Sequence, residues 1–194
     1  MPAIDADRWN ARYRQGWHAV PHQPREILKC AEKYLARGGL VLDLAMGIGL
    51  NAWWLMKQNY RVVGVDISSE AVLCAKQRNP ELMAIIADLS EYYFPSKAFS
   101  AVLNFYFLDR SLLRDFARIL VPNGIAVVET LTTDMLEIKP ELPINFLLKK
   151  GELEDLFSGW TIHYYQEGWQ SSDHGGKKAI ASIIAQLPDS CSKC

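Results

Sequence analysis

The chain has 194 residues, of which 49% are hydrophobic, so it is long and apolar enough to form one domain with a substantial core. Its 21 basic and 22 acidic side chains give a formal charge of −1, which lacks the cationic surplus that favours nucleic acid or anionic membrane surfaces. It contains neither a membrane-spanning apolar stretch nor a secretory core, so we expect a cytoplasmic protein with no nucleic acid or membrane partner.

The cysteines are too few and too unevenly spaced for a disulfide framework. Cys191 and Cys194 offer two thiolates where a structural zinc site generally needs four ligands, so we expect no metal site. We expect one domain over residues 1–188, in which residues 1–37 form an N-terminal helical cap, and a disordered tail at 189–194.

The first predicted element is an amphipathic helix at residues 26–37, which ends at a pair of glycines. Short apolar runs then suit strands buried on both faces, and they fall at residues 40–45, 61–66, 82–87, 99–105 and 124–131. Helical stretches separate most of these runs, at residues 51–57, 69–78 and 111–120. This alternation predicts a doubly wound α/β fold, Rossmann-like, with a mostly parallel sheet that helices cover on both sides.

The pattern changes after residue 131. A linker at residues 132–149 contains two prolines and is long enough to act as a lid. A short helix is expected near residues 151–157, followed by two strands at 160–167 and 179–187. These two strands predict an antiparallel hairpin at the C-terminal side of the fold.

The segment at residues 43–52 reads DLAMGIGLNA and joins a buried strand to a helix. Gly47 and Gly49 allow unusual backbone torsions and let a ligand approach the unpaired amides at the start of that helix. In an open parallel sheet, this edge is where ligands bind. A tight connection with close helix packing is the alternative explanation of the glycines.

The next two predicted strands also end in carboxylates, Asp66 and Asp88. A carboxylate after the second strand can accept hydrogen bonds from two neighbouring ribose hydroxyls, which indicates a nucleoside ligand. For any one aspartate, helix capping or turn formation is an equally good explanation. Three aspartates at successive strand ends, counting Asp43, favour a shared site.

Two cofactors fit a glycine turn followed by a ribose-binding acid. The dinucleotide interpretation matches the spacing of Gly47, Gly49 and Ala52, but it places an anionic pyrophosphate beside Asp43. S-adenosylmethionine carries a cationic amino group and a sulfonium, which a nearby carboxylate attracts. Asp43 therefore favours S-adenosylmethionine over NAD.

These motifs make the chain resemble a class I S-adenosylmethionine-dependent methyltransferase. The resemblance is carried by DLAMGIGLNA at residues 43–52, GVDIS at 64–68 and ADL at 87–89. Within that class the chain is similar to the tellurite-resistance type of small methyltransferase, through WNARY at 9–13, KGEL at 150–153 and HGGKKAIAS at 174–182. The resemblance implies a seven-stranded sheet in the order 3-2-1-4-5-7-6, with an antiparallel C-terminal hairpin strand.

The resemblance also implies a set of cofactor-binding residues. The methionine end would be held by Asp43 and by the turn at Ala45, Gly47 and Gly49, with Asn104 facing it, while Asp66 would bind the ribose and Asn51 would belong to the same cofactor site. The adenine would meet Ile67, Asp88 and Leu89, and Trp9 and Tyr13 would come from an N-terminal segment that folds over the site. Ala45 stands where the family usually has its first glycine.

The predicted activity is methyl transfer from S-adenosylmethionine to a small-molecule acceptor, with a thiol or a tellurium or selenium oxyanion as candidates. Methyl transfer from a sulfonium is an in-line displacement that needs alignment and exclusion of water, so the sequence indicates no particular catalytic residue. The alternatives are an NAD-dependent oxidoreductase and a non-catalytic S-adenosylmethionine-binding module. Candidate residues for an acceptor pocket are Tyr106, Phe107, Phe146, Trp169 and His174.

Overall fold

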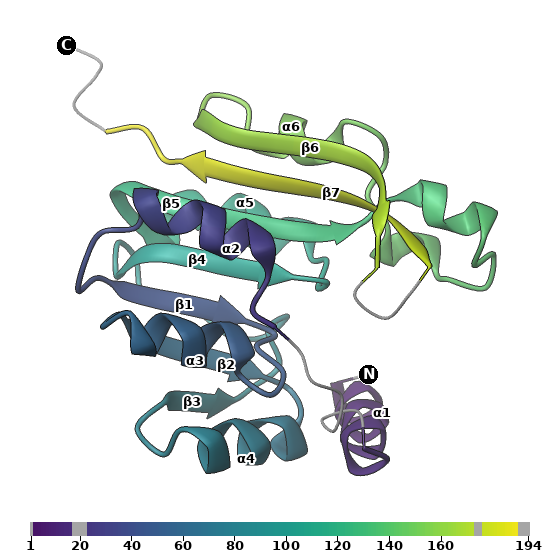
Figure 1. Ribbon diagram of the computed structural model, residues 1–194, viewed down its shortest axis with the longest axis horizontal. Helices are drawn as coiled ribbons and strands as arrows, with labels where there is room; N and C mark the ends of the chain where they lie inside the picture. Colours follow the sequence, from purple (N-terminus) through teal and green to yellow (C-terminus); the bar gives the residue numbers. More distant parts are fainter. Residues whose placement is uncertain (1, 17–22, 173–175, 190–194) are drawn as a thin grey trace.

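The computed structural model describes residues 2–16, 23–172 and 176–189. Its strands form one seven-stranded sheet in the order β3-β2-β1-β4-β5-β7-β6 (Figure 1). In chain order they are β1 (Leu40–Leu44), β2 (Arg61–Asp66), β3 (Met83–Ile86), β4 (Phe99–Phe105), β5 (Leu120–Leu131), β6 (Thr161–Ser171) and β7 (Lys177–Gln186). Strand β7 runs antiparallel to β5 and β6, while the other pairs are parallel. The predicted fold class and strand order are confirmed.

Helices cover both faces of the sheet, with α2 and α3 on one face and α5 and α6 on the other (Figure 1). The α-helices are α1 (Pro2–Arg14), α2 (Glu26–Ala31), α3 (Leu50–Lys57), α4 (Ser69–Arg78), α5 (Arg110–Ile119) and α6 (Glu152–Leu156). Helix α1 lies beside α4, near one end of the sheet. Within the described ranges, no helix combines the length and the apolar character that a bilayer span requires.

Several predicted boundaries agree with the structure, and others differ by one or more residues. Strands β2 and β4 and helix α4 have the predicted ends. Helix α2 is shorter than predicted, because the chain continues from Ala31 into a 3₁₀ turn at Glu32–Tyr34. Strand β5 begins at Leu120 rather than at residue 124, because Leu120 already pairs with Phe99 before the register shifts. The hairpin strands begin and end at somewhat different residues, and β6 extends to Ser171.

The predicted burial of residues 82–87 on both faces is wrong. Strand β3 is the edge of the sheet, and among the described strands it pairs with β2 alone. Met83 and Ile86 are therefore 46% and 57% exposed. An apolar run alone does not distinguish an edge strand from a central one, which explains the error.

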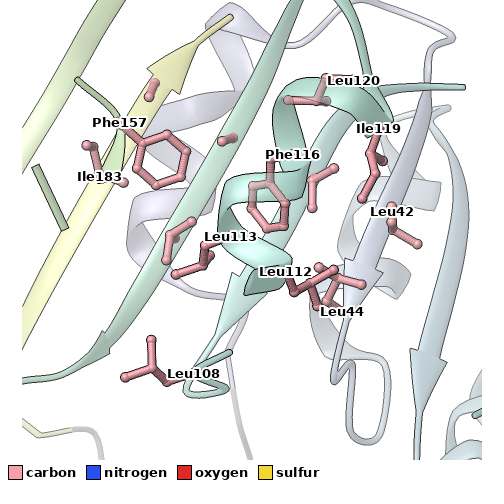
Figure 2. Packing of buried hydrophobic residues seen from close by; sticks show 14 of the residues in the cluster. Leu42, Leu44, Leu108, Leu112, Leu113, Phe116, Ile119, Leu120, Phe157 and Ile183 are labelled. Carbon is pink, nitrogen blue, oxygen red and sulfur yellow. The ribbon is translucent and has the colours of Figure 1, made fainter. Parts of the chain in front are cut away.

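The main core lies between the sheet and α5, as Figure 2 shows. Leu112, Leu113, Phe116 and Ile119 on α5 are buried and point toward the sheet, because they recur at helical spacing. Burying each such side chain contributes about 1.5–3 kcal/mol. This packing fixes the central strands, and hence the positions of the side chains at their carboxyl ends.

The linker that was predicted as a lid is anchored at both ends. The Thr132 amide donates to the Ala179 carbonyl at 3.0 Å, and the Leu148 amide donates to the Leu131 carbonyl at 3.0 Å. Arg110 donates to the Glu152 carboxylate and to the Leu147 carbonyl, which ties α5 to this segment. Ile144 in the middle of the segment is 66% exposed. Any closing movement would therefore be confined to the part between these anchors.

Candidate functional site

The turn between β1 and α3 has the backbone conformation that its glycines suggest. Gly47 and Gly49 have φ angles of +56° and +69°, in the left-handed region. A Cβ on Gly49 would lie 3.0 Å from the Cβ of Ala75, so this glycine also allows α3 to begin close to α4. The close-packing explanation therefore applies to Gly49, and the approach of a ligand to this turn stays a prediction.

Ala45 occupies the first glycine position of the motif with a φ of +50°. An L-residue in this region costs roughly 1–2 kcal/mol relative to glycine, and part of that is offset by the greater unfolded-state entropy of glycine. We expect Ala45→Gly to raise the free energy of unfolding by about 0.5–1 kcal/mol. Urea unfolding of the two proteins checks this, and a loss of stability would show that the Ala45 methyl group makes packing contacts worth more than the strain.

Asp43 lies near the end of β1 and is 1% exposed. Neither of its carboxyl oxygens has a hydrogen-bond partner among the described residues. Burial, together with the nearby charge of Asp66, raises the pKa of this carboxyl to about 7, although the Ala52 amide lowers it. Buried polar groups are nearly always hydrogen-bonded, so an unpartnered carboxyl is a strong indication that something else binds there. A ligand that carries a positive charge would satisfy it.

Asp66 lies at the end of β2 and faces the same turn. Its Oδ2 accepts from the Gly47 amide at 2.7 Å, and its Oδ1 accepts from the Ser68 amide at 2.8 Å. Burial raises the pKa of this carboxyl, and the amide hydrogen bonds lower it. A carboxylate can accept about four hydrogen bonds. The bonds from the Gly47 and Ser68 amides therefore leave Asp66 able to accept from a pair of hydroxyls.

Asp88 forms a local turn after β3. Its Oδ1 accepts from both the amide and the hydroxyl of Ser90, at 2.9 and 2.7 Å, which is the turn-forming role considered for each aspartate. Leu89 is 7% exposed and belongs to the main core, while Ile67 is half-buried. These three residues follow neighbouring strand ends, β2 and β3, on the side of the sheet next to Asp66.

Two asparagines flank the turn. The Asn51 side-chain oxygen accepts from the Arg25 amide at 3.1 Å and so joins the start of α3 to the start of α2. Asn104, 1% exposed at the end of β4, donates to the Phe107 carbonyl at 3.0 Å. Its Oδ1 has no hydrogen-bond partner within the described part of the chain. Like the Asp43 carboxyl, this oxygen can accept a hydrogen bond from a ligand.

Helix α1 is docked against the glycine turn. The Asn10 side-chain oxygen accepts from the Ser68 hydroxyl at 2.8 Å and from the Glu70 amide at 3.2 Å, which caps α4. Tyr13 is 7% exposed, and its hydroxyl lies 2.8 Å from where a Gly47 Cβ would be. Trp9 packs on the same small apolar cluster. The structure thus brings Tyr13 together with Gly47, beside Asp66.

The geometry agrees with what comparison with known proteins shows. Residues 41–124 match the family model described as a methyltransferase domain. Over these residues the chain is similar to a methyltransferase domain. A 23S rRNA (uracil(747)-C(5))-methyltransferase from Pyrococcus abyssi is 32% identical over 103 residues, which are 50% of this chain and 24% of that protein. The matched segment therefore spans only about a quarter of that relative's length.

Solved structures share the same architecture. An S-adenosylmethionine-dependent methyltransferase from Methanosarcina mazei has a TM-score of 0.68 and 20% identity, covering 86% of this chain and 99% of its own. TehB from Haemophilus influenzae has a TM-score of 0.69 and 16% identity, covering 92% of this chain and 67% of its own. At these identities the likeness shows a common fold. The Methanosarcina protein is named as S-adenosylmethionine-dependent, which agrees with the cofactor predicted from the sequence.

Other predicted positions are less informative. Phe107 packs against the main core, and Phe146 and Trp169 are 44% and 38% exposed. His174, Cys191 and Cys194 lie outside the described residues. The described ranges contain no group of three or more metal-ligating side chains.

The sequence interpretation did not include Glu129, which is 7% exposed on β5. A signal was present, because a glutamate inside the apolar strand at residues 124–131 requires a buried partner. Its partners come from strands that lie far away in the sequence, and only the fold shows which they are.

Proposed function

We propose that this protein transfers a methyl group from S-adenosylmethionine to a small-molecule acceptor. The observation that carries the proposal is the Asp43 carboxyl, buried and without a partner among the described residues, at the end of β1. The amino group of S-adenosylmethionine is cationic and fits it, whereas the pyrophosphate of a dinucleotide does not. When bound, this cofactor supplies an electrophilic methyl group on a sulfonium.

We expect different residues around the turn to bind different parts of the cofactor. Asp43 and the Asn104 Oδ1 would accept from the methionine end, and Asp66 would accept from the ribose hydroxyls while it holds the turn through the Gly47 amide. The absence of a side chain at Gly47 lets the cofactor approach the backbone. Ile67, Asp88 and Leu89 would contact the adenine. The remaining cofactor-binding residues would be Trp9, Tyr13, Ala45, Gly49 and Asn51.

The fold argues against the oxidoreductase alternative. A dinucleotide-binding sheet is parallel with the order 3-2-1-4-5-6, whereas here the antiparallel β7 lies between β5 and β6. The match to a methyltransferase domain argues against a purely cofactor-sensing module.

RNA is a second candidate acceptor, because curated relatives are named as 23S rRNA methyltransferases. The formal charge of −1 favours a small molecule, since RNA binding normally depends on a cationic surface. The candidate small-molecule acceptors are a thiol and a chalcogen oxyanion. An acceptor that binds as an anion needs no general base, whereas a protonated thiol does.

Calorimetric titration and product analysis test the proposal. We expect S-adenosylhomocysteine to bind and NAD to give no heat. With S-adenosylmethionine present, we expect S-adenosylhomocysteine to be released in the presence of 2-mercaptoethanol, 4-nitrothiophenol, selenite or tellurite, and not with ribosomal RNA. Release with RNA alone would replace the small-molecule acceptor with RNA, and binding of NAD alone would overturn the proposed activity.

A further inference from the structure

A polar cluster with a buried glutamate lies near the carboxyl end of β4, and holding the cofactor does not account for it. It consists of Tyr106, Glu129, Lys178 and Ser182, from the end of β4, from β5 and from β7. The Tyr106 hydroxyl donates to Glu129 Oε1 at 2.7 Å and accepts from the Lys178 ammonium at 2.7 Å. The Ser182 hydroxyl donates to Glu129 Oε2 at 3.1 Å. The Lys178 and Glu129 side chains are only 15% and 10% exposed.

Donors surround both carboxyl oxygens of Glu129. The Tyr106 hydroxyl donates to Oε1 and the Ser182 hydroxyl donates to Oε2. The Lys178 ammonium lies 3.9 Å from Oε1, which is the distance of an ion pair and not of a hydrogen bond. Glu129 is therefore joined to the Tyr106 hydroxyl by a hydrogen bond in which its Oε1 is the acceptor.

Tyr106 is held in an uncommon backbone conformation. Its φ is +58°, which a bulky L-residue seldom adopts, and its amide donates to the Glu129 carbonyl at 2.8 Å. Such strain is unfavourable and persists where the surroundings impose it, often at functional sites. Here the strain fixes the ring and hydroxyl of Tyr106 two residues beyond Asn104.

The cluster connects directly to the proposed cofactor turn. The Arg25 guanidinium lies 4.5 Å from the centroid of the Tyr106 ring, and the Arg25 amide donates to Asn51 at the start of α3. Asp43 and Glu129 also lie on the same face of the sheet, on β1 and β5, with β4 between them. Tyr106 thus stands at the carboxyl end of β4, beyond the strands that carry Asp43 and Asp66.

We propose that Tyr106 contacts the methyl acceptor and that Glu129, acting through the Tyr106 hydroxyl, takes the proton that a neutral acceptor loses. This inference rests on the proposed function and names its substrate class: a nucleophile X–H, such as a protonated thiol, rather than an anion. A lone pair on X forms the X–C bond as the C–S bond breaks, with its electrons going to sulfur. The proton of X passes to Tyr106 Oη, and the phenol proton passes to Glu129 Oε1. Lys178 positions Oη and stabilises the negative charge that develops on it.

The test compares two thiols that differ in ionisation. 4-Nitrothiophenol is ionised near neutral pH and needs no proton acceptor, whereas 2-mercaptoethanol is mostly protonated. We expect Glu129→Gln and Tyr106→Phe each to lower kcat for 2-mercaptoethanol by about 100-fold and kcat for 4-nitrothiophenol by less than about threefold. The double variant should be no slower than either single one, because the two groups act in one relay.

The matched control is Glu167→Gln. Glu167 accepts from the Tyr165 hydroxyl at 2.6 Å, so it belongs to a similar tyrosine–glutamate pair, but on the edge strand β6. We expect this variant to behave as wild type with both thiols. All variants should bind S-adenosylhomocysteine within about twofold of wild type, which separates the relay from a loss of the cofactor site.

Several results would overturn the relay. Equal losses with both thiols would show a structural role for Glu129, and unchanged rates with both would show no role. If the wild type methylates neither thiol, a proton-bearing thiol is rejected as the acceptor class. Binding of S-adenosylhomocysteine by that same protein would then mean that only the relay is wrong. Absence of binding would mean that the proposed function is wrong as well.

Discussion

Replacing Asp43 with asparagine should stabilise the cofactor-free protein at pH 8 and weaken its binding of S-adenosylhomocysteine. The reason is that the Asp43 carboxyl is buried without a hydrogen-bond partner among the described residues, so its charge is costly until a cation binds. Asparagine has nearly the same shape and carries no charge. A buried charge that lowers stability at a strand end is the pattern expected of a binding site.

The stability effect should depend on pH in a defined direction. The pKa of Asp43 rises from 3.8 to about 7 on folding. Below about pH 4 the carboxyl is neutral in both states and contributes nothing. Between about pH 4 and 7 the unfolded chain loses this proton while the folded chain keeps it, so the free energy of unfolding falls as pH rises. Above pH 7 the loss is complete, on the order of 4 kcal/mol at about 1.4 kcal/mol per pKa unit.

Urea unfolding of wild type and Asp43→Asn at pH 4.5, 6 and 8 measures this. The difference between the two proteins should grow with pH up to about 7 and then level off. Asp155→Asn, which removes an exposed carboxylate from α6, controls for the change in net charge. If the difference in the free energy of unfolding between the two proteins is the same at all three pH values, Asp43 does not have the raised pKa of a buried carboxyl.

Replacing Asp66 with alanine should weaken the binding of S-adenosylhomocysteine by about 1–3 kcal/mol, or about 5- to 150-fold in the dissociation constant. Asp66 holds the Gly47 and Ser68 amides and, in the proposed complex, also accepts from the ribose hydroxyls. Calorimetric titration of the two proteins gives the ratio of dissociation constants. An unchanged constant would remove Asp66 from the site.

A second ligand separates the ribose contact from damage to the turn. The 2′,3′-dideoxy analogue of S-adenosylhomocysteine lacks the two hydroxyls, so wild type should bind it more weakly than the parent compound. Asp66→Ala should bind the two ligands with nearly equal affinity, because the partner of the hydroxyls is gone. If the variant discriminates as strongly as wild type, Asp66 acts only by supporting the turn.

Much of the fold could be predicted because local and global signals agree. Strands such as β2 and β4 are short apolar runs between helical stretches, and their ends follow directly from the change of periodicity. The edge position of β3 could not be predicted, since it depends on which strands pair. The start of β5 at Leu120 likewise depends on pairing with Phe99.

Site residues that belong to one continuous sequence motif could be predicted. Contacts between residues on different strands could not. Asp43, Gly47 and Asp66 follow from strand ends and a glycine turn, but the hydrogen bond between the Gly47 amide and Asp66 requires two strands to be neighbours. Glu129 and Lys178 are 49 positions apart in the chain and meet only because β7 pairs with β5.

A crystal structure of the protein with S-adenosylhomocysteine is the most direct measurement of the central claim. We predict density for the nucleoside at the carboxyl ends of β1, β2 and β3, with its ribose hydroxyls on the Asp66 carboxylate and its amino group facing Asp43. A complex in which the ligand lies elsewhere, or in which both aspartates remain without contact to it, would contradict the account.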